Sequence, residues 1–379
     1  MTQATTTAEN GRADALLASY ERAGYARVCP KILQPAEPFL ALSGEDIRRR
    51  MYLVSDAAGR EFCLRPDLTI PVALDYLASD AAGRPASFCY IGSVFRQRAE
   101  ACGEFVQAGV ESFGRDDKAA ADAETLALAL EATAHYGLPA PEIRMGDVAL
   151  FASLIEALGL PPLWKRRLVK DFNRKALLAE DLDRLALAGA KERAEHQGVL
   201  AAFANSDPKG ARALVADLLS IAGISTVGGR SVGEIADRFL EQAEIGASAL
   251  PNETRVVIER FFAVAGEPDA AAAELWRLAE AANLELGPAI ELFESRTGLL
   301  AARGIDTRQI RFATAFGRGL DYYTGFVFEL HDPQGRADGQ FVAGGRYDGL
   351  FTRLGCAEPI PAVGLSAWIE RLVAIGGGR

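Results

Sequence analysis

The sequence predicts an α+β protein whose antiparallel sheet is flanked by helices and whose chain carries a helical insertion. Three observations predict this. Alternating apolar and polar residues, typical of strands, recur within residues 1–146; Ala- and Leu-rich segments with helical spacing fill 147–305; and strand patterns return over 306–379. We therefore expect 1–146 and 306–379 to form two halves of one core, separated by the insertion.

The first half begins with a helical pattern at Ala13–Ala23. Three strands are expected after it, at Met51–Ser55, Glu61–Arg65 and Ser87–Arg96. A fourth segment, Glu104–Phe113, alternates so that polar side chains share one face with aromatic ones. A polar inner face is unusual for a core strand and indicates a ligand.

The insertion contains helical patterns between breaks rich in Gly and Pro. The helices expected are Val148–Leu158, Ala211–Ala222, Ser231–Ala243 and Asp269–Ala282. In the second half, strands are expected at Gln309–Phe316, Thr324–Leu330 and Gln340–Ala343, followed by an amphipathic helix at Leu365–Ile375. Since few residues follow that helix, we expect no further C-terminal domain.

The composition disfavours several classes of protein. The formal net charge of the 379 residues is −10, so no overall positive field attracts a nucleic acid. Five cysteines and three histidines form no metal-ligand spacing and no disulfide framework. Neither a P-loop nor a dinucleotide-binding motif is present in the sequence, and no apolar run is long enough for a membrane span. We expect a cytoplasmic protein without metal, cofactor or membrane contact.

Polar residues lie at the ends of apolar strands or on their inner faces. Asp67 and Thr69 follow one strand, Arg96 ends another, and Gln107 and Glu111 share a strand face. Together they offer both signs of charge and are suited to a small zwitterion. A structural role stays open for each, because Arg–carboxylate pairs occur in sheets and Asp67 is also placed to cap a helix.

An amino acid with an imidazole side chain requires three kinds of partner. Its ammonium requires a carboxylate and neutral acceptors, its carboxylate requires guanidinium or amide donors, and its ring requires an acceptor. The residues that match these requirements are Asp67, Thr69, Arg96, Gln107, Glu111, Arg318 and Tyr323.

Around these residues the sequence resembles the catalytic domain of histidyl-tRNA synthetases, which have the class II aminoacyl-tRNA synthetase fold. Leu64–Thr69 resembles the LRPE-x-T segment, and Phe95–Arg96 with Phe105–Glu111 resembles the second class motif. Arg318–Glu329 is similar to the histidine-specific RGLDYYT-x-x-VFE signature, which is highly specific. Ala343–Asp348 resembles the second histidine-specific motif.

The resemblance implies a role for each site residue. Asp67, Thr69 and Gln107 correspond to residues that hold the amino group of histidine. Glu111 and Tyr323 correspond to imidazole partners, and Arg96 or Arg318 to partners of the carboxylate. Tyr322, in the same signature as Tyr323, belongs to the expected ligand-binding set.

The sequence departs from the synthetases where they bind ATP and tRNA. The second class motif has Arg98 in place of a glutamate, and the loop Ala99–Glu104 is short and acidic, which disfavours a triphosphate. In Gly364–Leu372, which resembles the third class motif, Trp368 replaces a glycine. We therefore expect the ATP pocket to be filled. The anticodon-binding domain is expected to be missing, and with it the tRNA partner.

An intact amino-acid site combined with a damaged nucleotide site resembles the family of ATP phosphoribosyltransferase regulatory subunits. That resemblance implies a non-catalytic chain that supports a short catalytic subunit in histidine biosynthesis, binds free histidine and relays feedback inhibition. It also implies a self-dimer, formed near Tyr25–Phe39. Two alternatives stay open: an enzyme that adenylates histidine, and an interaction protein with a vestigial pocket.

Overall fold

The computed structural model describes residues 3–43, 45–99, 102–172, 174, 177–178, 180, 182, 252–320, 322–336 and 339–376. The chain divides into two compact units, one of residues 1–153 with 261–379 and one of residues 154–260. The expected helices Ala211–Ala222 and Ser231–Ala243 lie outside the described residues. The insertion boundaries at 147 and 305 stay a prediction.

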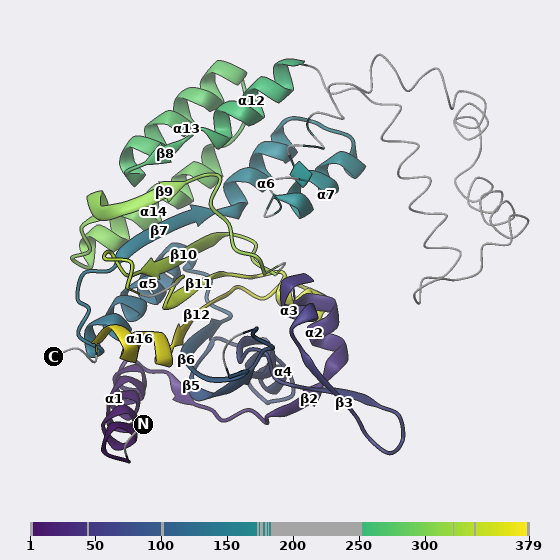
Figure 1. The fold of residues 1–379 in the computed structure, drawn as a ribbon. Helices are drawn as coiled ribbons and strands as arrows, with labels where there is room; N and C mark the ends of the chain where they lie inside the picture. Colours follow the sequence, from purple (N-terminus) through teal and green to yellow (C-terminus); the bar gives the residue numbers. More distant parts are fainter. Residues whose placement is uncertain are drawn as a thin grey trace, which may run out of the picture. The chain divides into compact units, whose positions relative to one another are not determined.

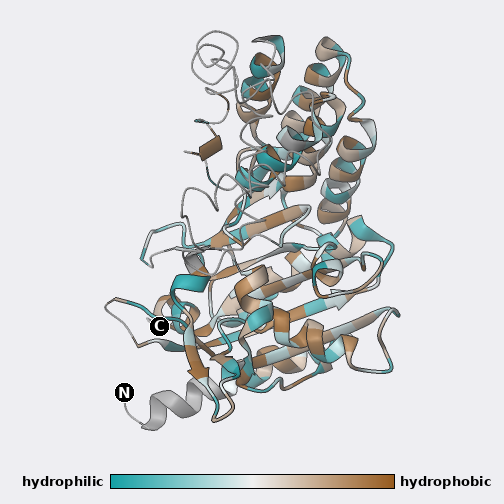
Figure 2. Ribbon diagram, turned by 90° about the vertical axis from the view of Figure 1, so that its right-hand side faces the viewer, coloured by the Kyte–Doolittle hydropathy of each residue, from teal (hydrophilic) through white to brown (hydrophobic). Residues whose placement is uncertain are grey.

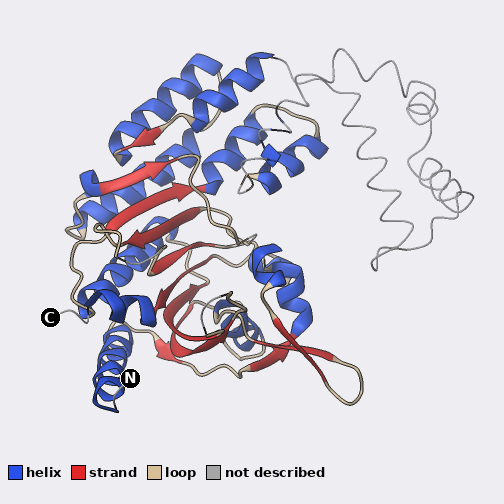
Figure 3. Ribbon diagram, in the orientation of Figure 1, coloured by secondary structure: helices blue, strands red, loops and turns tan. Residues whose placement is uncertain are grey.

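The first unit contains a nine-stranded sheet (Figures 1 and 3). Its strand order is β1-β5-β6-β12-β11-β10-β7-β9-β8. The strands span Ala26–Arg27 (β1), Ala86–Phe95 (β5), Glu104–Phe113 (β6), Glu142–Asp147 (β7), Ala265–Gly266 (β8), Ile310–Ala313 (β9), Phe326–His331 (β10), Val342–Arg346 (β11) and Ala362–Trp368 (β12). Strands β10 to β12, from the end of the sequence, lie together between β6 and β7, from its first half.

The centre of the sheet is antiparallel, from β5 through β6, β12, β11 and β10 to β7. Two pairs nearer its edges, β1 with β5 and β7 with β9, are parallel, which the expectation of an antiparallel sheet did not include. In both cases a long stretch of chain separates the two strands, and parallel pairing requires such a crossover.

A second, three-stranded sheet has the order β2-β4-β3. Its strands are β2 (Leu33–Pro35), β3 (Tyr52–Ser55) and β4 (Glu61–Leu64), all antiparallel. The expected strands at Met51–Ser55 and Glu61–Arg65 are thus confirmed to within a residue. Two helices, α2 (Ala36–Leu42) and α3 (Glu45–Arg49), follow β2 along the chain.

One face of the large sheet is covered by α5 (Lys118–His135), which contacts β10, β11 and β12. α14 (Gly287–Ala302) packs on α5, and α13 (Pro268–Ala282) packs on α14 and β9. α1 (Gln3–Arg22) contacts β5, β6 and α5, while the 3-10 turn η1 (Thr307–Gln309) precedes β9. The strands of this sheet carry mostly hydrophobic colour in Figure 2, as expected for a sheet enclosed by helices.

The opposite face of the sheet packs against α4 (Thr69–Leu77) and α15 (Leu350–Arg353). Tyr76 of α4 lies at the centre of an aromatic cluster with Phe88, Phe113 and Phe351, whose ring centroids are 5.0–6.2 Å from its own. Tyr76 lies in the last turn of α4, so the cluster anchors that end of the helix against β5 and β6. Ile70, Val72 and Ala73 are buried in the same core and hold the start of the helix.

The described part of the second unit includes most of α7 and α12, which span Pro162–Asp171 and Asn252–Phe262, and the end of α6 (Val148–Ala157). Trp164 and Leu168 are buried in α7, and Lys165 forms an ion pair with Glu156 at 2.6 Å. The helix α6 was expected, at Val148–Leu158, whereas α7 and α12 were not among the expected helices.

The end of the chain differs from its expected form. We expected a helix at Leu365–Ile375, whereas Leu365 to Trp368 complete strand β12 and the helix α16 spans Ile369–Gly376. A short apolar run fits both a helical and a strand pattern. In the structure this segment is a strand because it pairs with β6 and β11. This difference matters because β12 forms part of the site.

Candidate functional site

The floor of the site is a row of paired residues on β6 and β12. Glu111 pairs with Gly364, Gly109 with Ser366 and Gln107 with Trp368. Residues two apart on a strand share a face, so all of these side chains lie on the α4 side of the sheet. The polar face expected from the alternation in Glu104–Phe113 is therefore present.

A cavity of about 190 Å³ lies above this floor. Drug-sized ligands occupy pockets of about 300–1,000 Å³, so this cavity is suited to a molecule the size of an amino acid. Seven of the eight predicted site residues line it, namely Asp67, Thr69, Arg96, Gln107, Arg318, Tyr322 and Tyr323. Residues more than 200 positions apart in the sequence thus line one cavity.

Asp67 has two different environments for its two carboxylate oxygens. Oδ1 accepts a hydrogen bond from the backbone N–H of Ile70 at 3.1 Å, which is the helix-capping role that the sequence left open. Oδ2 is buried and has no hydrogen-bond partner among the described residues. Burial raises the pKa of Asp67, and the charge of Arg96 opposes that rise. A cation in the cavity would satisfy Oδ2.

Arg96 is anchored through one of its nitrogens. Its Nε donates to the carbonyl oxygen of Pro66 at 2.7 Å, and its guanidinium carbon lies 5.5 Å from the centre of the Phe105 ring. Burial lowers the pKa of Arg96 to about 10, while Asp67 opposes that change. Arg96 nevertheless stays charged at neutral pH and places a positive group beside Asp67.

Arg318 belongs to a polar chain at the other side of the cavity. Its Nη1 donates to the Tyr323 hydroxyl at 2.6 Å, and its Nε contacts Glu329 at 3.2 Å. The other oxygen of Glu329 lies 3.0 Å from Nε2 of His331. These contacts hold the pKa of Glu329 below its usual value in spite of burial. Arg318 and Tyr323 are therefore fixed before any ligand arrives.

Glu111 does not line the cavity directly, unlike the other predicted residues. It is 1% exposed, and its carboxylate accepts hydrogen bonds from the hydroxyls of Tyr90, at 2.9 Å, and Tyr347. Burial raises the pKa of Glu111 to about 8, and the hydrogen bonds from Tyr347, Thr69 and Tyr90 oppose the rise. Tyr347 lines the cavity, so it separates Glu111 from the open space.

The glycine opposite Glu111 makes this arrangement possible. A Cβ at Gly364 would clash with Oε2 of Glu111 and would lie 2.6 Å from the backbone carbonyl oxygen of Val110, which cannot move aside. The carboxylate therefore extends over Gly364, where Tyr347 reaches it. An alanine at this position would displace Glu111 and with it Tyr347, which is bonded to Glu111 and lines the cavity.

One wall of the cavity contains bulky side chains. Trp368 lines the cavity, and the guanidinium carbon of Arg371 lies 5.1 Å from the centre of its ring system. Arg371 also donates to the backbone carbonyl of Gln340, which lines the cavity as well. An indole stacked under a guanidinium occupies volume that a glycine would leave open.

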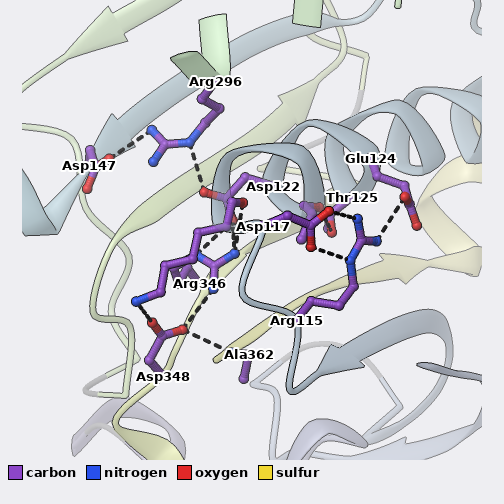
Figure 4. Close-up of polar contacts among 12 residues, drawn as sticks. Arg115, Asp117, Asp122, Glu124, Thr125, Asp147, Arg296, Arg346, Asp348 and Ala362 are labelled. Carbon is purple, nitrogen blue, oxygen red and sulfur yellow. Dashed lines mark hydrogen bonds and ion pairs between the residues drawn. The ribbon is translucent and has the colours of Figure 1, made fainter. Parts of the chain in front are cut away.

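A buried ion-pair network lies on the α5 face of the sheet, directly behind the site (Figure 4). Asp122 of α5 accepts from Arg296 at 2.9 Å and from Arg346 at 2.6 and 2.9 Å. Arg296 also bonds Asp147 at 2.8 Å, and Arg346 bonds Asp348 at 2.9 Å. Since Arg346 ends β11 and Tyr347 follows it, the network fixes the strand end from which Tyr347 reaches Glu111.

Several cavity residues were not predicted individually. Tyr347 lies within the motif Ala343–Asp348, so the sequence held a signal for it. Ser366 lies within Gly364–Leu372, which resembles the third class motif, but nothing marked it individually, and Gln340 lies outside every motif. Arg50, which precedes β3, also lines the cavity and is far from every motif.

The described residues contain no group of three or more His, Cys, Asp or Glu side chains that could hold a metal ion. None of the helices that the structure describes is long and apolar enough to cross a membrane. The site instead offers a carboxylate oxygen, buried guanidinium groups and several hydroxyls. Such a set recognises a small polar molecule with both charges.

Comparison with known proteins agrees with these features. The family model for histidyl-tRNA synthetase matches residues 3–226 and 210–372. The chain is 42% identical over 351 residues to proteins of Brucella canis and Brucella suis, each named ATP phosphoribosyltransferase regulatory subunit. In each case the match covers 92% of this chain and 92% of the relative.

Solved structures share the fold at lower identity. A protein of Bacillus halodurans, described as an ATP phosphoribosyltransferase regulatory subunit/histidyl-tRNA synthetase, matches with a TM-score of 0.67 at 21% identity, over 97% of this chain and 79% of that one. Histidyl-tRNA synthetase from Nostoc matches with a TM-score of 0.62 at 19% identity, over 98% of this chain and 72% of that one. The fold is thus that of the class II synthetase core, and the chain belongs to the family of ATP phosphoribosyltransferase regulatory subunits, which is related to histidyl-tRNA synthetases.

Proposed function

We propose that this chain binds free histidine in the cavity and, as a non-catalytic regulatory subunit, transmits histidine binding to a catalytic subunit of ATP phosphoribosyltransferase. The observation that carries the proposal is the buried, unpartnered Oδ2 of Asp67 beside Arg96 in a cavity of amino-acid size, seen among the residues described. This pair supplies one acceptor for an ammonium and one donor group for a carboxylate.

The two ends of the cavity suit the two ends of histidine. Asp67, Thr69 and Gln107 would receive the ammonium, and Arg96 or Arg318 the carboxylate. At the other end, the hydroxyl of Tyr347 donates to Glu111, so its oxygen is free to accept from an imidazole N–H. In this arrangement Glu111 acts through Tyr347, and Tyr323 offers a second hydroxyl, with Tyr322 packed beside it at a centroid distance of 5.0 Å.

Regulation requires that histidine binding changes the free energy with which the chain forms its complex with the catalytic subunit. Ordinary allosteric coupling amounts to about 1–3 kcal/mol, which corresponds to about 5–150-fold in affinity. Support for the partner comes from the names of the relatives, which are regulatory subunits of ATP phosphoribosyltransferase. A cytoplasmic location and the lack of a tRNA partner stay predictions from the sequence.

A self-dimer is the second part of the proposal. One face of the small sheet carries Leu33 and Val54, both exposed, together with half-buried Tyr52, Phe62 and Leu64. We call these five residues the small-sheet face. A contiguous apolar face is typical of a protein interface. It includes β2, which lies within the segment Tyr25–Phe39 predicted to form the dimer.

Isothermal titration tests the binding proposal. We expect histidine to bind the purified chain, and ATP to produce no heat and no histidine-dependent pyrophosphate exchange. ATP binding together with exchange would instead favour a histidine-adenylating enzyme. Absence of both binding events would favour an interaction protein with a vestigial pocket. Adding the catalytic subunit then tests whether histidine affinity and complex formation are linked.

A further inference from the structure

We propose that Ser366 is a specificity-determining residue of the cavity and that its hydroxyl donates a hydrogen bond to the inner ring nitrogen, Nδ1, of the bound histidine. This inference rests on the proposed function, because it names a contact to the ligand that the cavity is proposed to bind. The observations that carry it are the position of Ser366 and the state of its hydroxyl.

Ser366 occupies the middle of the cavity floor. It lies on β12 between Gly364 and Trp368, and it pairs with Gly109 on β6, between Glu111 and Gln107. Alternate residues on a strand are about 7 Å apart, so Ser366 is equally far from both ends of the floor. It lines the cavity.

The hydroxyl of Ser366 is buried and has no hydrogen-bond partner within the described part of the chain. The reason is local: its cross-strand neighbours are Gly109 on one side and Ala343 on the other, and neither has a polar side chain. Buried hydroxyls are normally hydrogen-bonded. The Ser366 hydroxyl faces a cavity, and its two neighbours cannot form a hydrogen bond with it. It is therefore available to a ligand.

The cavity contains a second group of this kind, Oδ2 of Asp67. The two groups differ chemically, since the carboxylate oxygen accepts and the hydroxyl both donates and accepts. Asp67 therefore fits the ammonium of the ligand, whereas Ser366 fits a neutral nitrogen with a lone pair. In a histidine that extends from Asp67 towards Glu111, Nδ1 lies between the ammonium and the outer nitrogen Nε2.

The remaining contacts decide the protonation of the ring. If Nε2–H donates to the Tyr347 hydroxyl, which donates in turn to Glu111, the neutral imidazole has its lone pair on Nδ1. Ser366 is then the donor to that lone pair. The site thereby selects one tautomer of histidine and rejects a ring whose inner nitrogen is blocked.

Ser112 provides a matched control. Its hydroxyl is likewise buried and without a hydrogen-bond partner among the residues described, but it does not line the cavity. It lies on β6 next to Glu111 and therefore faces the opposite side of the sheet. Ser366→Ala and Ser112→Ala thus remove equivalent hydroxyls, one inside and one outside the proposed site, and both variants are expected to keep the melting temperature of the wild type.

The test is titration of the full chain and both variants with histidine, Nδ1-methylhistidine and Nε2-methylhistidine. We expect Ser366→Ala to weaken histidine binding by about threefold to tenfold, as for one lost hydrogen bond, and Ser112→Ala to leave it unchanged. The preference for histidine over Nδ1-methylhistidine should shrink in Ser366→Ala. The preference over Nε2-methylhistidine should not change.

Equal histidine affinity in Ser366→Ala and wild type would overturn the inference, and so would an unchanged preference against Nδ1-methylhistidine. Either result leaves the proposed function intact, since the wild type still binds histidine. Failure of the wild type itself to bind histidine would overturn both. The two failures are therefore distinguished within a single set of titrations.

Discussion

The guanidinium of Arg98 lies over the ring of Phe105, with its central carbon 3.9 Å from the ring centre. Its Nη1 also lies 3.5 Å from a carboxylate oxygen of Glu370. Arg98 is the residue that replaces a glutamate of the synthetase motif. It therefore packs along β6 as a structural cation.

We expect the chain to show no histidine-dependent exchange of pyrophosphate into ATP. Two changes act together, because Arg98 reverses one charge and Trp368, which lies beside Arg371, occupies space at the cavity wall. The single reversion Arg98→Glu should therefore leave exchange at background. An exchange assay with a histidyl-tRNA synthetase as positive control checks this, and exchange that appears in Arg98→Glu alone would show that the cavity wall is no obstacle.

Glu111 predicts a pH dependence of stability. Its pKa rises from 4.5 to about 8 on folding, so the folded chain binds more protons than the unfolded chain between these values. Its contribution to stability is therefore present below about pH 4.5 and is lost as the pH rises towards 8. Glu111→Gln keeps a neutral hydrogen-bonding group and should flatten this decline in thermal stability.

The control for this measurement is Glu104→Gln, which changes an exposed glutamate at the start of the same strand. It should keep the pH profile of the wild type. A parallel decline in wild type and Glu111→Gln between pH 5 and 8 would mean that other groups set the profile.

Much of the fold follows from local patterns in the sequence. Glu104–Phe113 was predicted with its correct bounds, and Ser87–Arg96 is shifted by one residue from β5, because strict alternation and turn residues mark such strands. The strand β12 was missed at Leu365 to Trp368. Its apolar run fits a helix equally well, and only pairing with β6 and β11 distinguishes the two.

The candidate site likewise contains residues that the sequence could identify and contacts that it could not. Charged residues such as Asp67 and Arg96 were identifiable because polar groups in apolar strands require partners. The sequence could not show that Tyr347 lies between Glu111 and the cavity. That arrangement depends on the space left by Gly364 and on where β11 ends. Likewise, Ser366 lies on the cavity floor only because β12 pairs with β6 in a particular register, and no local sequence pattern specifies that register.

Substitution of Arg296 is expected to lower the free energy of unfolding strongly. Arg296→Met would leave Asp122 and Asp147 without this buried counter-charge, and breaking a buried pair costs about 3–5 kcal/mol in free energy of unfolding. Chemical denaturation measures the change. Arg308→Met removes an exposed arginine paired with Asp306 and should alter stability little, so equal effects in both variants would contradict the structural role of the network.

The small-sheet face predicts the oligomeric state. Val54→Asp places a charge in the proposed dimer contact and should shift the chain from dimer to monomer in sedimentation equilibrium at a given concentration. Val256→Asp is the matched control, because Val54 and Val256 are both 44% exposed and Val256 belongs to α12. A dimer that survives Val54→Asp, or a wild-type monomer, would exclude this face as the contact.

Asp67→Asn predicts opposite effects on binding and on stability. The amide loses the charge that would hold the ligand's ammonium, and hydrogen bonds to charged groups contribute about 1.5–3 kcal/mol, so histidine affinity should fall by about tenfold to a hundredfold. Oδ1 of the amide still caps α4 at Ile70.

Because burial raises the pKa of Asp67, the ionised carboxylate is costly in the unliganded chain, and its removal should leave the melting temperature equal or higher. Such a pair of results is typical of binding residues that are kept at a cost in stability. Titration and thermal unfolding of the same samples measure both quantities, with Asp75→Asn as the control, an exposed carboxylate of α4 outside the cavity. Unchanged affinity in Asp67→Asn would exclude Asp67 as the ammonium partner, and a lower melting temperature would show that the charge of Asp67 beside Arg96 stabilises the unliganded chain.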